Sequence, residues 1–199
     1  IRNSVLISVI EAVLCISIAI PAAYAFSRLK FKGNNHLLFW LLTNRMAPAA
    51  AFLIPYYTLY VSLKLFDTLL GLVIVNSIAN LPFTIWLLKG FIDGIPKDIE
   101  EAAMVDGYTF WQMLTKIVLP LLRPAIIVSG LFVFVFTWNE MLFASLFTTS
   151  TDAMPLTGGL LHYMSQTWVN WGEIAALTII TISPIIGFVY YLQRYLARA

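Results

Sequence analysis

The chain has 199 residues, of which 60% are hydrophobic and 11% charged, and its mean hydropathy is +0.86. This composition lies far outside the balance of a soluble domain, so a lipid bilayer is the expected surrounding. Twelve basic and ten acidic residues give a net charge of +2, which is too balanced to indicate a nucleic-acid partner. The single cysteine, Cys15, lies in an apolar run, so we expect neither a disulfide framework nor a cysteine metal site.

Five apolar segments are long enough to cross a bilayer as helices, because a span needs roughly 20 residues. They cover residues 4–26, 37–61, 69–88, 125–147 and 174–192. The first segment could be taken for a signal peptide, but it is too long, carries Glu11 and lacks a small-residue cleavage site. We therefore predict an all-α integral membrane protein whose whole chain, residues 1–199, forms one membrane domain.

The basic residues predict the orientation of these spans, since they collect on the cytoplasmic side of membrane proteins. Nine of the twelve fall on one side, namely Arg28, Lys30, Lys32, Lys89, Lys97, Lys116, Arg123, Arg194 and Arg198. The segment between the third and fourth spans is thus predicted to be cytoplasmic, and residues 148–172 to lie outside. Five spans would leave Ile1 outside, and the chain lacks an initiator methionine, so we expect a sixth span to precede it.

The cytoplasmic segment at about 91–120 carries the signals of two short helices. A proline suits the first position of a helix over residues 96–106, and Gly107 can adopt the left-handed conformation that ends it. Thr109 and Gln112 then fit a capping box at the start of a second helix, which we expect Pro120 to stop. The result is a helix, a sharp turn and another helix that project from the membrane.

The same segment contains a spaced motif, Glu101-Ala102-Ala103, Asp106-Gly107, Ile117, Leu119 and Pro120. This spacing resembles the cytoplasmic EAA loop of ABC importer permeases. The resemblance implies that the first helix sits in a groove of an ATP-binding subunit, where the counterpart of Glu101 pairs with a basic residue and Gly107 permits the bend. The alternative is that an amphipathic loop merely lies on the lipid headgroups, helped by its lysines.

Other stretches extend the resemblance over nearly the whole chain. They are Asn3-Ser4, residues 23–28, Pro48, Ile54-Pro55 and Trp138-Asn139-Glu140. Together they resemble the second permease subunit of carbohydrate and polyol importers. This implies a type I ABC importer transmembrane domain in a prokaryotic cytoplasmic (inner) membrane, a second permease subunit as a heterodimer partner, two ATP-binding subunits, and an extracytoplasmic solute-binding protein.

We expect no cofactor or metal on this chain. The sequence contains no phosphate-binding Gly-rich loop with Lys and Ser or Thr, and no arrangement of residues that indicates catalysis. ATP and Mg²⁺ would therefore be bound by the partner ATPase, and this chain would be a transport subunit rather than an enzyme.

Polar residues at membrane depth are the candidates for a substrate path, because ionisable groups are costly there. They are Glu11, Arg45, Asn76, Asn80, Trp138, Asn139 and Glu140. Each has a structural alternative: Arg45 could pair with Glu11 or the other permease, the asparagines could join helices, and Trp138 could anchor at the interface. Kinks around a shared cavity are expected at Pro21, Pro48, Pro55, Pro82 and Pro184.

The outer segment 148–172 is too apolar for an idle loop, since it holds Tyr163, Trp168 and Trp171. We expect it to meet the soluble binding protein, or alternatively to form an interfacial re-entrant helix. Three other functions stay open: a secondary transporter with a half-helix substrate site, an ABC importer for a substrate other than a carbohydrate, and a structural scaffold. Secondary transport would predict paired acids at mid-depth and internal repeats, and a scaffold would not need the motif at 101–120.

Overall fold

The computed structural model describes residues 1–160 and 171–196, and every regular element in these ranges is helical. Along the chain these are α1 (Arg2–Arg28), α2 (Asn34–Met46), η1 (Ala49–Phe52), α3 (Leu53–Ser62), α4 (Leu69–Asp93), α5 (Lys97–Val105), α6 (Phe110–Met113), η2 (Leu114–Val118), α7 (Leu119–Leu121), α8 (Arg123–Trp138), α9 (Leu142–Phe147), α10 (Leu156–Leu160) and α11 (Trp171–Leu196). The predicted all-α class is confirmed.

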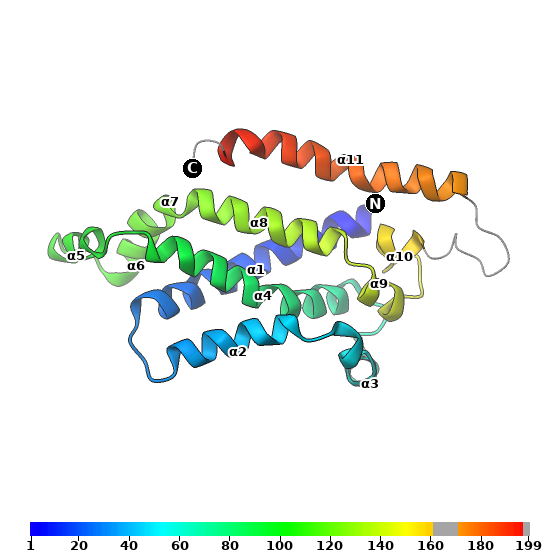
Figure 1. The fold of residues 1–199 in the computed structure, drawn as a ribbon, viewed down its shortest axis with the longest axis horizontal. Helices are drawn as coiled ribbons and strands as arrows, with labels where there is room; N and C mark the ends of the chain where they lie inside the picture. Colours follow the sequence, from blue (N-terminus) through cyan, green and yellow to red (C-terminus); the bar gives the residue numbers. More distant parts are fainter. Residues whose placement is uncertain (161–170, 197–199) are drawn as a thin grey trace.

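The centre of the fold is a bundle of α1, α4 and α8, which pack against one another (Figure 1). Small residues line the buried face of α1 at mostly four-residue spacing: Ser4, Ser8, Cys15, Ala19 and Ala23. Such spacing lets helix backbones approach closely in a membrane. Gly130 of α8 serves the same contact, because a Cβ there would come within 3.0 Å of Ile16 Cδ1. α2 lies along α4, and α11 lies along α8 (Figure 1).

The first, third and fifth predicted spans are observed as continuous helices. α1 and α4 are each long and apolar enough to cross a membrane, and α4 begins at a cap in which the Thr68 hydroxyl accepts from Gly71 N at 3.0 Å. Pro21 and Pro82 lie inside α1 and α4 without ending them. α11 covers the fifth span.

The predicted span over 37–61 is not one continuous helix, and the kink expected at Pro48 is observed as a break. α2 ends at Met46, and the pair formed by α2 and η1–α3 is bent by 91°. Pro48 explains the break, because it lacks an N–H and disfavours helical geometry in the residue before it. Ala47 accordingly has extended dihedral angles, φ −65° and ψ 138°.

The prediction of one helix over 125–147 is also wrong. α8 ends at Trp138, and α9 begins at Leu142 after a short break. The Glu140 carboxylate accepts from the backbone N–H groups of Phe143 and Ala144 at 2.9 and 3.0 Å, so it caps the new helix. A side chain that satisfies these two amides makes a separate start more favourable than a continuation of α8.

Pro120 does not stop the preceding helix, contrary to our prediction. The chain stays helical through η2, a π-helical stretch, and α7 before it bends by 72° into α8. A π-bulge changes the hydrogen-bonding register, which lets a helix pass a residue without an N–H. The bend itself falls after Leu121, one residue beyond the proline.

The two ends of the bundle are built differently. At one end α5, α6 and η2 pack on α1 and α4 through a buried apolar cluster that includes Tyr24, Leu88 and Ala103. At the other end α3, α9 and α10 gather (Figure 1), and the Asp67 carboxylate accepts from Ser150 and Thr149 N–H groups. These amides hold the pKa of Asp67 below its usual value. In the predicted outer loop, Tyr163 and Trp168 lie outside the described residues, and Trp171 is exposed at the start of α11.

Candidate functional site

The loop between α4 and α8 folds by the local signals in its sequence. The helix predicted over 96–106 is observed as α5, with Pro96 and Asp106 as its flanking residues. Gly107 has φ +86°, the left-handed conformation that the turn requires. The capping box of Thr109 and Gln112 is present at the start of α6. This segment, residues 94–122, is hereafter called the coupling loop after its predicted role.

A buried cluster of charged and polar groups holds the coupling loop against the end of α1. Arg28 Nε and Nη2 lie 2.7 and 2.6 Å from Glu100 Oε1, and the Tyr24 hydroxyl donates to Glu100 Oε2 at 2.7 Å. Arg28 Nη2 also donates to the carbonyl of Ile95 at 2.8 Å. The Arg28 and Glu100 side chains are only 8% and 10% exposed. Charge-assisted bonds of this kind fix the loop to α1 as well as to the helices that it connects.

The motif residues divide into an exposed and a packed set. Glu101, Ala102, Asp106 and Gly107 are exposed, whereas Ala103 is buried and Ile117, Leu119 and Pro120 are partly buried. Around the exposed set lie large apolar side chains that the described chain leaves about half exposed or more: Met104 is 51% exposed, Val105 87% and Trp111 69%. The loop thus presents an apolar surface with acidic groups, which is typical of a protein interface.

Three of the polar path candidates form a network in the bundle together with the neighbouring Thr137. The Asn80 amide donates to Glu11 Oε1 at 2.7 Å, and its oxygen accepts from Arg45 Nη1 at 2.8 Å. Thr137 Oγ1 lies 2.6 Å from Glu11 Oε2. Asn80 therefore bridges Glu11 and Arg45, whereas our alternative was a direct pair of these two residues. The network joins α1, α2, α4 and α8 at membrane depth.

The remaining path candidates either form hydrogen bonds with other groups of this chain or lie next to the network. Trp138 is 2% exposed and donates from its indole nitrogen to the carbonyl of Thr181 in α11 at 3.0 Å. Asn139 is exposed but donates to Val135 of its own helix, and Glu140 caps α9. Asn76 is buried in α4, one turn from Asn80. Their contact with a substrate stays a prediction.

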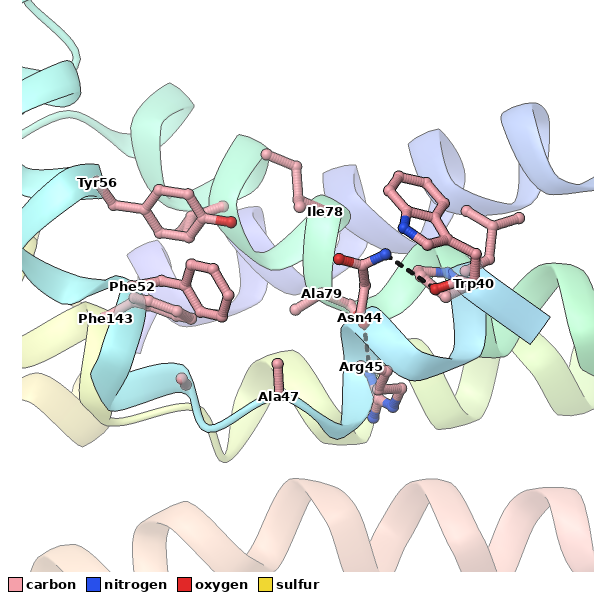
Figure 2. A pocket seen from close by; sticks show the side chains of 13 residues that line it. Trp40, Asn44, Arg45, Ala47, Phe52, Tyr56, Ile78, Ala79 and Phe143 are labelled. Carbon is pink, nitrogen blue, oxygen red and sulfur yellow. Dashed lines mark hydrogen bonds between the residues drawn. The ribbon is translucent and has the colours of Figure 1, made fainter. Parts of the chain in front are cut away.

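The break between α2 and η1 borders a cavity of about 400 Å³ between α2, α3 and α4. Its walls include Trp40, Asn44, Phe52, Tyr56 and Phe143 (Figure 2). Among these residues are aromatic rings and polar atoms, so the cavity can contact both apolar and hydroxylated groups. No group of three or more His, Cys, Asp and Glu side chains suited to a metal ion occurs in residues 1–160 and 171–196.

Sequence reasoning missed the Arg28–Glu100 contact, and it expected a shared cavity at the proline kinks without placing it. Tyr24 and Arg28 are four residues apart and so share one helix face, which is a signal for a common partner. Their partner Glu100 is 72 residues away from Arg28, and no local pattern relates the two. The cavity depends on where α2 breaks, which the apolar run did not reveal.

Comparisons with known proteins agree with this architecture. The family model for the binding-protein-dependent transport system inner membrane component matches residues 15–199. The probable ABC transporter permease protein y4oR of Sinorhizobium fredii is 36% identical over 197 residues, which are 98% of this chain and 70% of that protein. The maltose/maltodextrin transport system permease protein MalG of Vibrio parahaemolyticus is 32% identical over 199 residues, 98% of this chain and 67% of that protein.

A solved structure has the same fold. It is that of a bacterial ABC transporter involved in the import of the acidic polysaccharide alginate, with a TM-score of 0.81 and 24% identity. The match covers 98% of this chain and 73% of that chain. At this level of identity the likeness concerns the fold alone.

Proposed function

Because this chain belongs to the family of binding-protein-dependent transport system inner membrane components, a family of ABC importer permeases, we propose that its coupling loop docks on an ATP-binding subunit. The observation that carries this proposal is the exposed surface of α5 and α6, where Met104, Val105 and Trp111 stand beside Glu101 and Asp106. Apolar side chains exposed to this degree on a projecting loop call for a protein partner.

The geometry supports a mechanism for the coupling. An ATP-binding subunit that binds α5 and then moves displaces Glu100, which lies next to the exposed Glu101. The Arg28–Glu100 contact transmits this displacement to α1. The buried apolar cluster around Ala103 transmits the same displacement to α4. Closure of two ATPase subunits on ATP and Mg²⁺ would thereby switch the path from inward-facing to outward-facing, because packed helices move as units rather than deform.

We further propose that the substrate is a sugar, oligosaccharide or polyol. The support is the name of the maltose/maltodextrin permease among the relatives and the Trp138-Asn139-Glu140 sequence. The proposed partners are a second, similar permease subunit, two ATP-binding subunits and a soluble binding protein on the outer side. An importer for a substrate other than a carbohydrate is the second candidate, because y4oR is named only as a permease.

The test compares Glu101→Lys with Glu101→Gln in the complete transport complex. Reversal of the charge should lower the amount of ATPase that copurifies and the uptake per ATP hydrolysed, and the neutral change should do so less. Asp152→Lys, on the far side of the predicted membrane domain, is the matched control for the amount of ATPase that copurifies. Full ATPase assembly and normal uptake in the Glu101→Lys complex would refute the docking proposal.

A further inference from the structure

The break between α2 and η1 leaves two residues of extended, non-helical backbone, Ala47 and Pro48, inside the membrane domain. α2 has 13 residues and therefore rises about 20 Å before it ends, well within a hydrocarbon core of about 30 Å. The residues that follow are exposed from Pro48 to Phe52, so this chain does not cover them. Non-helical backbone at membrane depth is tolerated only where protein buries it or where it lines a water-filled cavity. The cavity of about 400 Å³ lies at this break.

Two polar atoms face one another across the cavity. Figure 2 shows the Tyr56 hydroxyl and the Asn44 amide oxygen pointing toward each other. The amide nitrogen of Asn44 donates to the carbonyl of Trp40 at 2.9 Å, which leaves the amide oxygen as an acceptor toward the cavity. Within the described residues the Tyr56 hydroxyl makes no hydrogen bond. A lipid chain in this place would leave both groups unsatisfied, at a cost in free energy.

The rest of the lining is mostly apolar, with aliphatic as well as aromatic side chains, and its one charged group among the described residues is Arg45. The rings of Phe52 and Tyr56 stack with their centroids 5.9 Å apart, and the ring centroid of Phe143 lies 6.2 Å from that of Tyr56. Arg45 also borders the cavity, but its guanidinium donates to Ala79 and Asn80 and lies over the ring of Phe136 at 4.8 Å. A neutral ligand with apolar faces and hydroxyl groups matches this set of contacts.

We propose that this cavity is a subsite for one sugar ring or one short polyol on its way through the membrane. The apolar face of the ligand packs on the Phe52 and Tyr56 rings, Asn44 Oδ1 accepts from one hydroxyl, and the Tyr56 hydroxyl donates to another. The volume lies in the range of about 300 to 1,000 Å³ that small-molecule pockets occupy. The inference rests on the proposed carbohydrate function and adds a site to it.

The first test uses the complete complex in proteoliposomes, with saturating loaded binding protein and radiolabelled maltose and trehalose as probes. Tyr56→Phe and Asn44→Ala should each lower the sugar delivered per ATP by about threefold to tenfold, the loss expected for one hydrogen bond. Tyr57→Phe and Asn35→Ala are matched controls from the same helices, outside this lining, and should deliver as the unchanged complex does. Equal delivery by all four variants overturns the subsite.

The second test asks what fills the cavity. In a Cys15→Ser background, Asn44→Cys and Tyr56→Cys should react with the small charged reagent methanethiosulfonate ethylammonium, and the transported sugar should slow that reaction. Absence of labelling means that lipid or the partner permease occupies the space, which overturns the proposal. Labelling that the sugar does not slow overturns it as well. If the unchanged complex assembles with its ATPase but transports no member of a panel of sugars and polyols that includes both probes, the carbohydrate class assigned to this subsite is refuted, while the coupling proposal stands.

Discussion

Removal of the Glu100 carboxylate should uncouple ATP hydrolysis from transport. In a Glu100→Ala variant, Arg28 loses both contacts to Oε1 and Tyr24 loses its acceptor, while the exposed docking surface around Glu101 is unchanged. The loop can still bind an ATPase subunit but no longer pulls directly on α1. ATPase activity should therefore persist while uptake falls.

The magnitude follows from the burial of the pair. Loss of one partner from a buried ion pair costs about 3 to 5 kcal/mol, because the other charge stays buried without compensation. The Arg28 and Glu100 side chains are 8% and 10% exposed, so the lower end of that range applies to a contact near the membrane surface. At about 1.4 kcal/mol for each factor of ten, the equilibrium constant for the loop packed against α1 falls about a hundredfold. Uptake per ATP should fall at least about tenfold.

The assay is the ratio of uptake to hydrolysis in proteoliposomes that contain the complete complex. Lys89→Ala is the matched control, since Lys89 and Asp93 form an exposed pair whose loss costs less than about 1 kcal/mol. A double variant, Arg28→Met with Glu100→Leu, should recover part of the coupling, because neither buried charge is left alone. Normal coupling in Glu100→Ala would refute the role of this contact.

Three further outcomes concern stability, each measured by thermal unfolding in detergent. Gly107→Ala should cost about 1 kcal/mol through its φ of +86°, whereas Gly90→Ala, in open space within α4, should cost nothing. Gly71→Ala should cost about 1 to 3 kcal/mol, since its Cβ would collide with the carbonyl of Leu65, and an unchanged midpoint would contradict the packing described. Asp67→Asn should destabilise the protein at pH 7. Because the pKa of Asp67 is lowered on folding, its contribution is complete above the unfolded value and disappears as pH falls through the folded one, so the two proteins should converge in strong acid.

The sequence predicted those parts of the fold that depend on local signals. Both ends of α5 and the start of α6 follow from Pro96, Gly107 and the capping box, which act within a few residues. The helix breaks were harder to predict, because a proline alone does not decide whether a helix kinks or ends. Pro21 lies inside a continuous helix, while Pro48 separates α2 from η1. The difference depends on which neighbours satisfy the freed carbonyl groups, and these neighbours are distant in sequence.

The candidate site could be predicted to a similar extent. The spacing predicted the coupling loop, whose helices and turn are observed, while its docking role stays a prediction. The family assignment excludes the secondary transporter and the scaffold that composition alone left open. The polar residues at membrane depth gave less information, because the same side chains serve helix contacts and substrate contacts. Asn80 and Trp138 both bond to other helices in this structure, and only their burial and partners reveal that role.

The most direct measurement of the central claim is a cross-link between the coupling loop and the ATP-binding subunit. Val105 is 87% exposed at the end of α5, so Val105→Cys in a Cys15→Ser background should couple to that subunit through a reagent that joins thiols to amines. Thr151→Cys, at an exposed position of the predicted outer segment, should give no such product. A cross-link from position 151 and none from position 105 would contradict both the orientation and the docking function of the loop.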